Sequence, residues 1–333
     1  MKTETHPLKS NPNVTLTTYM LDPSQEMANA KVRPAILIFP GGGYRICSDR
    51  EAEPIAMAFL AQGYHAFVLR YSLNENAAFP RPIQDAEEAL ELIRSNAGKW
   101  GVIPDRVAVC GFSAGGHLAA ALGTMGRIRP NALILGYPVI LDTISGILPF
   151  PIPSVEQKVD PQTPPAFIFA TANDELVPVK HSLQFAAAMD QAKVPFELHI
   201  FQDGSHGLSL AKTFTSGGFK NLVNPDVAKW MELCTSWLEK LFCGFGVERE
   251  ALVESEPESD KTYNVDLPLE ICWKNPECQR LILTYFPGID QSPNLKAAMS
   301  MSLRVMNGYG RKLDDDGLND LDQKLRAIPF KNH

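Results

Sequence analysis

A serine between glycines is the first residue of this sequence whose surroundings suggest chemistry. It stands in the segment Gly111–Gly115, with the sequence G-F-S-A-G, which follows the apolar run "RVAVC" directly and precedes a helical pattern. A G-x-S-x-G segment between a strand and a helix is typical of a nucleophile elbow, a tight turn that exposes a serine hydroxyl. Glycines at 111, 115 and 116 leave room for neighbouring chain. We therefore predict Ser113 as a nucleophile.

A serine hydroxyl is a weak nucleophile that needs a general base, and the base needs a group to orient it. Two later residues can fill these roles. Asp174 follows the apolar run "PAFIFAT", and His206 follows the run "FELHIF" within "DGSHGLSL". Serine, aspartate and histidine in this order along the chain are typical of elbow enzymes. The sequence thus predicts a catalytic triad of Ser113, Asp174 and His206.

Each triad candidate also has a structural alternative. A G-x-S-x-G segment arises by chance, and an aspartate after a strand is often a turn former. His117 and His199 lie within a helix pattern and a strand pattern, so we expect structural roles for both. His206 differs because glycines flank it in a loop. The three candidates together, each after a strand, favour the triad over the alternatives.

A glycine run follows another apolar strand pattern. The run "FPGGGY", residues 39–44, comes directly after "PAILIF". Glycines at such a point allow backbone N–H groups to turn toward a developing negative charge, although polyglycine can also form a simple flexible loop. No Gly-Lys-Ser/Thr follows, so the run does not match a phosphate-binding loop.

The elements that must position these residues alternate along residues 14–242. Short β-branched runs alternate with amphipathic stretches, a pattern that predicts an α/β fold with a mostly parallel sheet flanked by helices. The candidates then lie at the carboxyl ends of strands, where open α/β sheets bind ligands. We expect strands at 14–21, 34–39, 65–71, 106–111, 131–137, 165–171 and 196–201, and helices at 49–62, 83–96, 114–125, 179–192 and 226–241.

The pattern changes after the last of these helices. Residues 248–262 are acidic and poor in large apolar residues, which predicts a linker between a catalytic domain, 1–247, and a small all-α module, 263–333. In the module we expect helices at 275–286, 292–306 and 317–328, the first two capped by Asn275 and Ser292 with proline following each.

Composition limits the partners. The chain has 333 residues and a net charge of −7, with no Lys/Arg-rich run, so nucleic acid and anionic membrane surfaces are poor partners. The N-terminus shows no apolar signal-peptide core and no segment is long enough to span a bilayer, so we expect a cytoplasmic protein. The six cysteines form no C-x-x-C pair, which argues against a zinc site and favours reduced thiols.

Residues 14–242 resemble the α/β-hydrolase fold, in particular its acetyl esterase/lipase-like branch related to hormone-sensitive-lipase-type and acetylxylan esterases. The resemblance lies in "FPGGGY", "SDREAEPIA", "FVLRYS", "CGFSAGGHLA", "LGYPVI", "TPPAF", "NDELVPV" and "GSHGLSLA". It implies that His206 acts as general base and then acid, that Asp174 holds the imidazole, and that no metal or organic cofactor is needed. It also implies an oxyanion hole formed by the backbone N–H groups of Gly42, Gly43 and Ala114.

The chain departs from the family pattern in two places. Pro40 stands where many relatives carry the histidine of an H-G-G-G motif, and residues 141–162, which would cover the site, are short and proline-rich. We therefore expect a shallow site for a small acyl group. Tyr44 and Arg45 follow the glycine run and are candidates to line the alcohol side, with a solvated surface charge as the alternative for the arginine.

The function expected from these features is a serine carboxylic-ester hydrolase that removes acetyl groups from acetylated xylo-oligosaccharides or similar small esters. The module resembles, more weakly, a helical segment appended to bacterial carbohydrate-active hydrolases; the alternative is a packing or homo-oligomerisation element without chemistry. Two other classes stay open. A serine peptidase uses the same triad but usually needs a further domain, and a non-catalytic scaffold would be expected to have lost a triad member.

Overall fold

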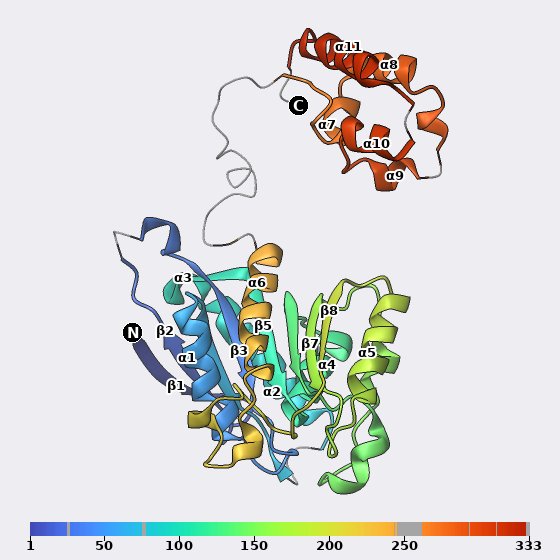
Figure 1. The fold of residues 1–333 in the computed structure, drawn as a ribbon. Helices are drawn as coiled ribbons and strands as arrows, with labels where there is room; N and C mark the ends of the chain where they lie inside the picture. The colour runs from blue at the N-terminus through green and yellow to red at the C-terminus, as the bar shows by residue number, and fades with distance from the viewer. Residues whose placement is uncertain are drawn as a thin grey trace. The chain divides into compact units, whose positions relative to one another are not determined.

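A sheet of eight strands forms the centre of the first part of the chain (Figure 1). Its order is β1-β2-β4-β3-β5-β6-β7-β8, with parallel pairing from β4 through β8 and antiparallel pairing of β2 with β1 and β4. The mostly parallel sheet confirms the predicted α/β fold. The strands are β1 (Lys2–Pro7), β2 (Thr15–Met20), β3 (Arg33–Phe39), β4 (His65–Arg70), β5 (Val102–Phe112), β6 (Ala132–Gly136), β7 (Ala166–Thr171) and β8 (Phe196–Phe201).

The computed structural model divides into two compact units, Met1–Leu252 and Val253–His333. The boundary falls inside the predicted linker, 248–262, which lies outside the described residues except for Thr262. No helix in the described ranges is long and apolar enough to cross a membrane. The structure describes residues 1–24, 27–74, 78–242, 244, 262–292, 294–310 and 312–330.

Strand β1 was not predicted, and its composition explains why. The segment KTETHP is almost entirely exposed and pairs antiparallel with β2, from Lys2 opposite Met20 to Pro7 opposite Thr15. It therefore joins the sheet through backbone hydrogen bonds at an edge and shows no apolar alternation that a sequence pattern could detect.

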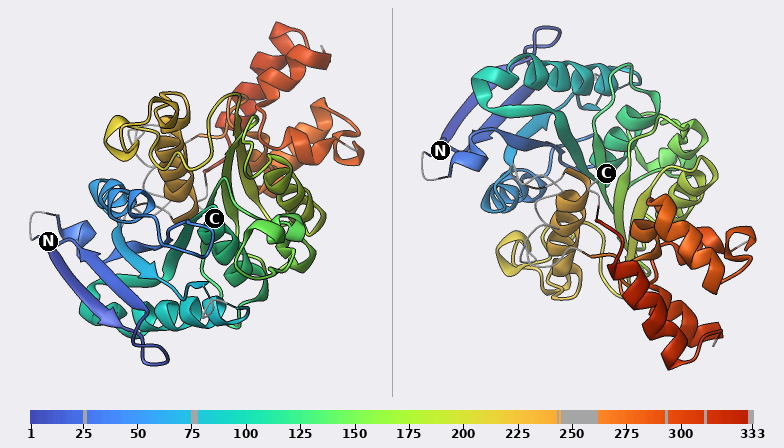
Figure 2. Two further views of the ribbon diagram at one scale, coloured as in Figure 1. Left: turned by 90° about the horizontal axis from the view of Figure 1, so that it is seen from below. Right: turned by 90° about the horizontal axis from the view of Figure 1, so that it is seen from above.

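Helices cover both faces of this sheet, as Figure 2 shows from below. In β3 the side chains of Leu37 and Phe39 join the core cluster that includes α2, α4 and α5, whereas Ile36 and Ile38 join the cluster that includes α1 and α6. A strand buried on both faces is apolar throughout, as "PAILIF" is. The helices of this unit are α1 (Glu53–Ala61), α2 (Arg81–Ser95), α3 (Ala97–Trp100), α4 (Ala114–Met125), α5 (Lys180–Gln191) and α6 (Trp230–Phe242).

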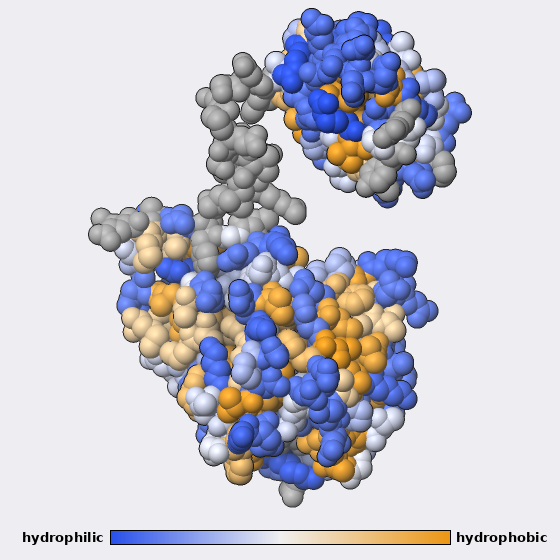
Figure 3. Space-filling view, in the orientation of Figure 1, coloured by the Kyte–Doolittle hydropathy of each residue, from blue (hydrophilic) through white to orange (hydrophobic). Residues whose placement is uncertain are grey.

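The second unit is a set of short helices around its own apolar core. In Figure 3 its visible described surface is mostly hydrophilic. Asn275 caps α8 as expected, accepting hydrogen bonds from the backbone N–H groups of Glu277, at 2.8 Å, and Cys278, at 3.3 Å. The helices are α7 (Leu269–Trp273), α8 (Pro276–Tyr285), α9 (Leu295–Ala298), α10 (Leu303–Gly310) and α11 (Asp315–Arg326).

The single helix predicted for 292–306 is wrong, because the structure has α9 and α10 in its place. The carbonyls of Met299 and Met301 accept hydrogen bonds from the N–H groups of Glu270 and Leu269, at 2.9 Å each. Because these carbonyls bind the N-terminus of α7, they are not available for hydrogen bonds within a continuous helix. The helix is therefore interrupted by a tertiary contact, which the local sequence pattern does not reveal.

Candidate active site

The predicted tight turn between a strand and a helix is present where β5 meets α4. Strand β5 ends at Phe112 and α4 begins at Ala114, so Ser113 alone forms the turn, with φ 52° and ψ −117°. A positive φ in a residue other than glycine is strained and needs support from its surroundings. Here the Ser113 N–H donates to Gly136 O at 3.0 Å, and Ser113 O accepts from the N–H of Val139 at 3.0 Å.

Two of the elbow glycines are required by close backbone approach. A Cβ on Gly111 would lie 2.1 Å from Gly115 O, and a Cβ on Gly115 would lie 2.1 Å from Phe39 O. Both distances are far below any van der Waals contact. The two glycines thus let strands β3 and β5 and helix α4 meet behind the serine, as the sequence argument required.

The structure brings the three triad candidates into one hydrogen-bonded line. His206 Nε2 lies 2.8 Å from Ser113 Oγ, and His206 Nδ1 lies 2.7 Å from Asp174 Oδ2. Asp174 Oδ1 accepts from the backbone N–H groups of Leu176 and Val177, both at 2.9 Å. The Asp174 side chain is 1% exposed and that of His206 is 15% exposed. The aspartate is thus fixed, and it fixes the ring in turn.

The three backbone N–H groups predicted to form an oxyanion hole have no protein partner among the described residues. In the described part of the chain, the N–H groups of Gly42, Gly43 and Ala114 donate no hydrogen bond to the protein. Ala114 is the first residue of α4, where helical N–H groups have no partner within the helix and the helix dipole favours negative charge. Gly42 has φ 128° and a Cβ there would lie 2.3 Å from Ile46 O.

Tyr44 does not occupy the position expected for it. Its side chain is fully buried, and its hydroxyl lies 2.9 Å from His117 Nδ1. The ring packs against Tyr71 and Phe150. With no exposed surface it cannot line the alcohol side of a site, so the expectation for Tyr44 is corrected: its side chain supports the glycine loop from inside the core.

Arg45 is exposed, and its guanidinium ties the glycine loop to the following cover segment. Its Nη2 donates to Ile147 O at 3.0 Å. That carbonyl belongs to the short 3₁₀ segment Asp142–Ile147. The Leu148 side chain lies 3.8 Å from the place where a Cβ on Gly43 would stand. Residues 142–148 therefore lie close beside the glycine loop.

Two buried histidines hold the same region together. His117 Nε2 lies 2.9 Å from Pro153 O, which can only accept, so Nδ1 accepts from the Tyr44 hydroxyl. His181 Nδ1 accepts from the backbone N–H groups of Ile140 and Leu141, at 2.9 and 3.1 Å. Burial lowers the pKa of each ring to about 4, which keeps both neutral. The structural role predicted for His117 is confirmed.

Sequence reasoning missed two polar residues behind the site, Glu51 and Tyr137. Glu51 is 2% exposed and accepts from the backbone N–H of Gly41 at 2.8 Å, and the Tyr137 hydroxyl donates to its other oxygen. The available signal was the position of Glu51 within "SDREAEPIA", directly after the glycine run. A pattern of residue types does not reveal that a carboxylate is buried.

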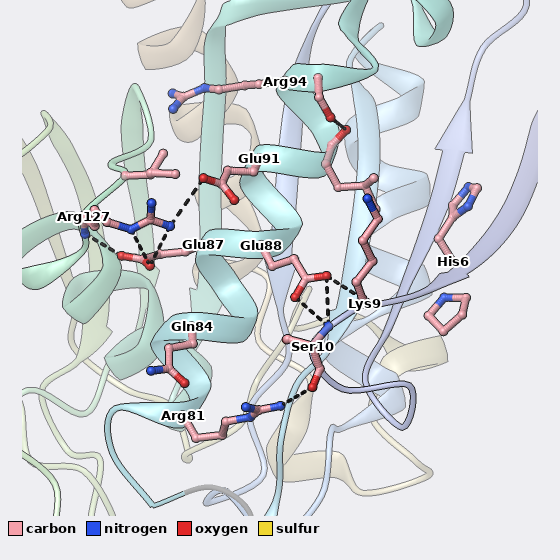
Figure 4. Close-up of a pocket in the computed structure, with 14 residues that line it drawn as sticks. His6, Lys9, Ser10, Arg81, Gln84, Glu87, Glu88, Glu91, Arg94 and Arg127 are labelled. Carbon is pink, nitrogen blue, oxygen red and sulfur yellow. Dashed lines mark hydrogen bonds and ion pairs between the residues drawn. The ribbon is translucent and has the colours of Figure 1, made fainter.

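A broad groove lies along α2, away from the triad (Figure 4). None of the triad residues lines it. Its charged side chains largely satisfy one another: Arg127 pairs with Glu87 and Glu91, and Glu88 accepts from the backbone N–H groups of Lys9 and Ser10. It therefore offers no convergent set of groups comparable with the triad.

Two family models match the chain. The model described as BD-FAE matches residues 21–133, and the model described as prolyl oligopeptidase family matches residues 151–234. The first range contains the glycine run and Ser113, and the second contains Asp174 and His206.

Several known proteins are similar to this chain. The crystal structure of MGS-M1, an α/β hydrolase enzyme from a Medee basin deep-sea metagenome library, is 49% identical with a TM-score of 0.70, and the match covers 73% of this chain and 98% of that one. The acetylxylan esterase of Xylanibacter ruminicola is 31% identical over 220 residues, 60% of this chain and 45% of that protein. Endo-1,4-beta-xylanase B of Butyrivibrio fibrisolvens is 35% identical over 216 residues, 56% and 34% of the two. The chain therefore matches about a third to a half of the length of these two curated relatives.

Proposed function

The chain belongs to the α/β-hydrolase family, and from this premise we propose that it is a serine carboxylic-ester hydrolase that removes short acyl groups, acetyl above all. One observation carries the proposal. A hydroxyl, an imidazole and a carboxylate lie in line at 2.8 and 2.7 Å, beside backbone N–H groups that have no partner in the described protein. This is the arrangement that acyl transfer requires.

The first half of the reaction forms an acyl-enzyme. Ser113 Oγ attacks the ester carbonyl carbon while His206 Nε2 accepts the hydroxyl proton. The carbonyl oxygen becomes an oxyanion and accepts hydrogen bonds from the N–H groups of Gly42, Gly43 and Ala114. When the carbon–oxygen bond of the ester breaks, His206 gives its proton to the departing alcohol.

The second half releases the acid. Water attacks the acyl carbon and passes a proton to His206, and the bond from carbon to Ser113 Oγ breaks as that oxygen takes the proton back. Asp174 keeps Nδ1 of the ring protonated, so that Nε2 is the nitrogen that faces the serine. It also stabilises the imidazolium formed in each half.

The cover segment, residues 142–148, supports a small acyl group. Leu148 lies near Gly43, and Arg45 holds the carbonyl of Ile147, so residues 142–148 lie beside the proposed oxyanion loop. A short, tethered segment supplies little apolar surface for a long acyl chain, which supports acetyl. Similarity to an acetylxylan esterase and to a xylanase supports acetylated xylo-oligosaccharides as the substrate class.

A serine peptidase is the second candidate, and one observation favours it. Residues 151–234, which contain Asp174 and His206, match the prolyl oligopeptidase family model. The same triad cleaves amides and esters, so assays must separate the two. We expect acetate release from acetylated xylo-oligosaccharides and no cleavage of aminoacyl amides by the same preparation; the reverse result would favour the peptidase.

The deciding variant is Ser113→Ala. Removing the nucleophile of such a triad lowers turnover by about 10⁶-fold, so p-nitrophenyl acetate hydrolysis and fluorophosphonate labelling should both vanish. Ser95→Ala, at an exposed serine at the end of α2, makes the same chemical change elsewhere and should leave both intact. Full activity in purified S113A protein would refute the proposed mechanism.

A further inference from the structure

Glu51 is a buried carboxylate that the proposed mechanism does not use. It ends the 3₁₀ turn Asp49–Glu51, between the glycine run and α1, and is 2% exposed. In the described part of the chain no basic side chain forms an ion pair with it. Burying a charge without a partner cation is costly unless hydrogen bonds satisfy it, so the contacts of this carboxylate call for an explanation.

One oxygen of Glu51 holds the glycine loop. Oε2 accepts from the Gly41 N–H at 2.8 Å. A Cβ built on Gly41 would lie 2.6 Å from Glu51 Oε2 and 3.1 Å from Ser113 Cβ, so the carboxylate, the loop and the nucleophile meet at one point. Gly41 directly precedes Gly42 in the chain. The hydrogen bond therefore fixes the peptide directly before Gly42 and Gly43, whose N–H groups are the proposed oxyanion donors.

The other oxygen of Glu51 accepts from the hydroxyl of Tyr137. Tyr137 follows Gly136, whose carbonyl receives the Ser113 N–H, and it has a strained φ of 35°. Burial and the neighbouring Glu51 charge raise the pKa of the Tyr137 hydroxyl well above its usual value, which keeps the hydroxyl protonated and able to donate.

Tyr137 also contacts the loop that carries the histidine. Its ring packs edge-on against the His206 ring, with 5.1 Å between centroids and 71° between planes. Its hydroxyl oxygen accepts from the Ser209 N–H at 2.9 Å, three residues after His206. Trp230 Nε1 donates to Ser209 O at 2.9 Å and anchors this loop to α6. One hydroxyl thus joins the Glu51 carboxylate to the histidine loop.

We propose that Glu51 and Tyr137 are a pair of positioning residues that hold the glycine loop and His206 in register with Ser113. The inference rests on the proposed function and adds to it the residues that set its geometry. Each contact is made to a loop that carries one part of the reaction: Gly41 for the oxyanion loop, and Ser209 and the imidazole ring for the base. Loss of the pair would displace the catalytic groups without removing any of them.

The test is steady-state hydrolysis of p-nitrophenyl acetate by Glu51→Ala, Glu51→Gln and Tyr137→Phe. Losing one oxyanion donor costs about 10²–10³-fold in kcat, and Glu51→Ala, which frees the whole loop, should lose about 10²-fold with KM changed less than about threefold. Tyr137→Phe keeps the ring against His206 and should lose about tenfold.

Glu51→Gln is the conservative rescue. Its amide oxygen can accept from the Gly41 N–H while its amide nitrogen donates to the Tyr137 oxygen, so both contacts survive without the charge. We expect it to recover most of the kcat lost in Glu51→Ala. If Glu51→Ala fails to fold, Glu51→Gln and Tyr137→Phe are compared with wild type, each per active site titrated with a fluorophosphonate. In that case kcat equal to wild type in Tyr137→Phe overturns the inference.

Glu87→Ala is the matched control. Glu87 is also a nearly buried glutamate that accepts a backbone N–H, that of Arg127, but it lies in the groove of Figure 4 and contacts no part of the triad. It should lower the melting temperature and leave kcat unchanged. If Glu51→Ala behaves the same way, with a lower melting temperature and unchanged kcat, Glu51 is only structural and the inference fails.

The failure of this inference differs from failure of the proposed function. Wild-type protein that hydrolyses no ester, or S113A protein that still does, overturns the function itself. Active wild type, inactive S113A and fully active Glu51→Ala and Tyr137→Phe overturn only the positioning pair.

Discussion

Buried carboxylates lie at the carboxyl edge of the sheet, whereas in the helical unit the charged side chains of the described residues 262–292, 294–310 and 312–330 are mostly exposed. As whole residues Glu51 and Asp174 are 2% and 5% exposed, and their carboxylates accept at least two and three hydrogen bonds. In the helical unit, the pairs Asp266–Arg304 and Asp320–Lys324 have side chains about half exposed. Burial of an ionised group is costly, and exposed pairs contribute little to stability.

This difference in the burial of charged groups indicates which region of the molecule must hold its side chains in place for a reaction. A stable fold gains little from a buried carboxylate that apolar residues could replace, so the cluster behind Ser113 is better explained by the reaction than by stability. The helical unit has the ordinary features of a packed module: an apolar core, helix caps and surface pairs. We therefore expect changes at the sheet edge to affect rate, and changes in the helical unit to affect stability alone.

After Ser113→Ala, the largest effect is expected for Asp174→Asn. The asparagine oxygen can still accept from Leu176 and Val177, but its amide donates toward His206 Nδ1 and places the ring proton on Nε2, which can then no longer take the serine proton. We expect kcat to fall about 10⁴-fold with little change in KM.

Kinetics on p-nitrophenyl acetate measure this effect, with Asp160→Asn as control. Asp160 pairs with Arg129, and its loss should reduce stability only. Equal rates for Asp174→Asn and wild type would contradict the triad.

Gly42→Ala comes next. A Cβ there would lie 2.3 Å from the carbonyl oxygen of Ile46, and φ is 128°, so the loop must move and carry its N–H with it. We expect a loss of about 10²–10³-fold in kcat, the cost of one oxyanion donor. Gly98→Ala is the matched control, because a Cβ there meets no atom within 4 Å and should leave kcat unchanged. A Gly42→Ala protein with normal kcat would exclude Gly42 from the oxyanion hole.

The third prediction concerns how the stability of the first unit, Met1–Leu252, depends on pH. Burial lowers the pKa of His65, His117 and His181 to about 4, against 6.5 for an unperturbed ring. The unfolded chain thus binds more protons, so the stability these rings contribute is complete above about pH 6.5 and is lost as pH falls toward 4. The loss is on the order of 3 kcal/mol per ring.

The dependence of the melting temperature on pH, measured by circular dichroism from pH 7.5 to 4.5, checks this prediction. The only histidine of the helical unit is the last residue of the chain, so the first unit should lose more stability than the second. His181→Gln should flatten the slope, since its amide oxygen can accept one of the two backbone N–H groups. A pH-independent melting temperature for the first unit would contradict the burial of neutral rings.

The smallest effect is expected for Asn275→Ala in the helical unit. The variant loses the cap that accepts from Glu277 and Cys278, which costs about 1 kcal/mol. Hydrogen exchange in α8 should quicken while kcat stays unchanged. The cap variant Asp314→Ala in α11 provides a second test of the same kind. A fall in kcat in either variant would contradict the expectation that changes in the helical unit affect stability alone.

The sequence was informative wherever function rests on local pattern. The elbow, the strands buried on both faces and the loop positions of Asp174 and His206 follow from glycines and apolar runs over a few residues. The sequence was uninformative where contacts join distant segments that carry no recognisable motif. Tyr137 and Glu51 are 86 positions apart, and the buried hydroxyl of Tyr44 contacts His117, 73 positions away. Such contacts leave no periodic signature in the chain.

The cover segment beside the glycine loop has a consequence for protein engineering. A library that aims to change acyl preference should diversify positions 142–148, where Ile147 is 53% exposed and Leu148 lies beside Gly43. The codons of Gly111 and Gly115 should stay fixed, because any side chain there would collide with the backbone. Every clone then differs only in the segment beside the glycine loop and keeps the turn that presents the serine.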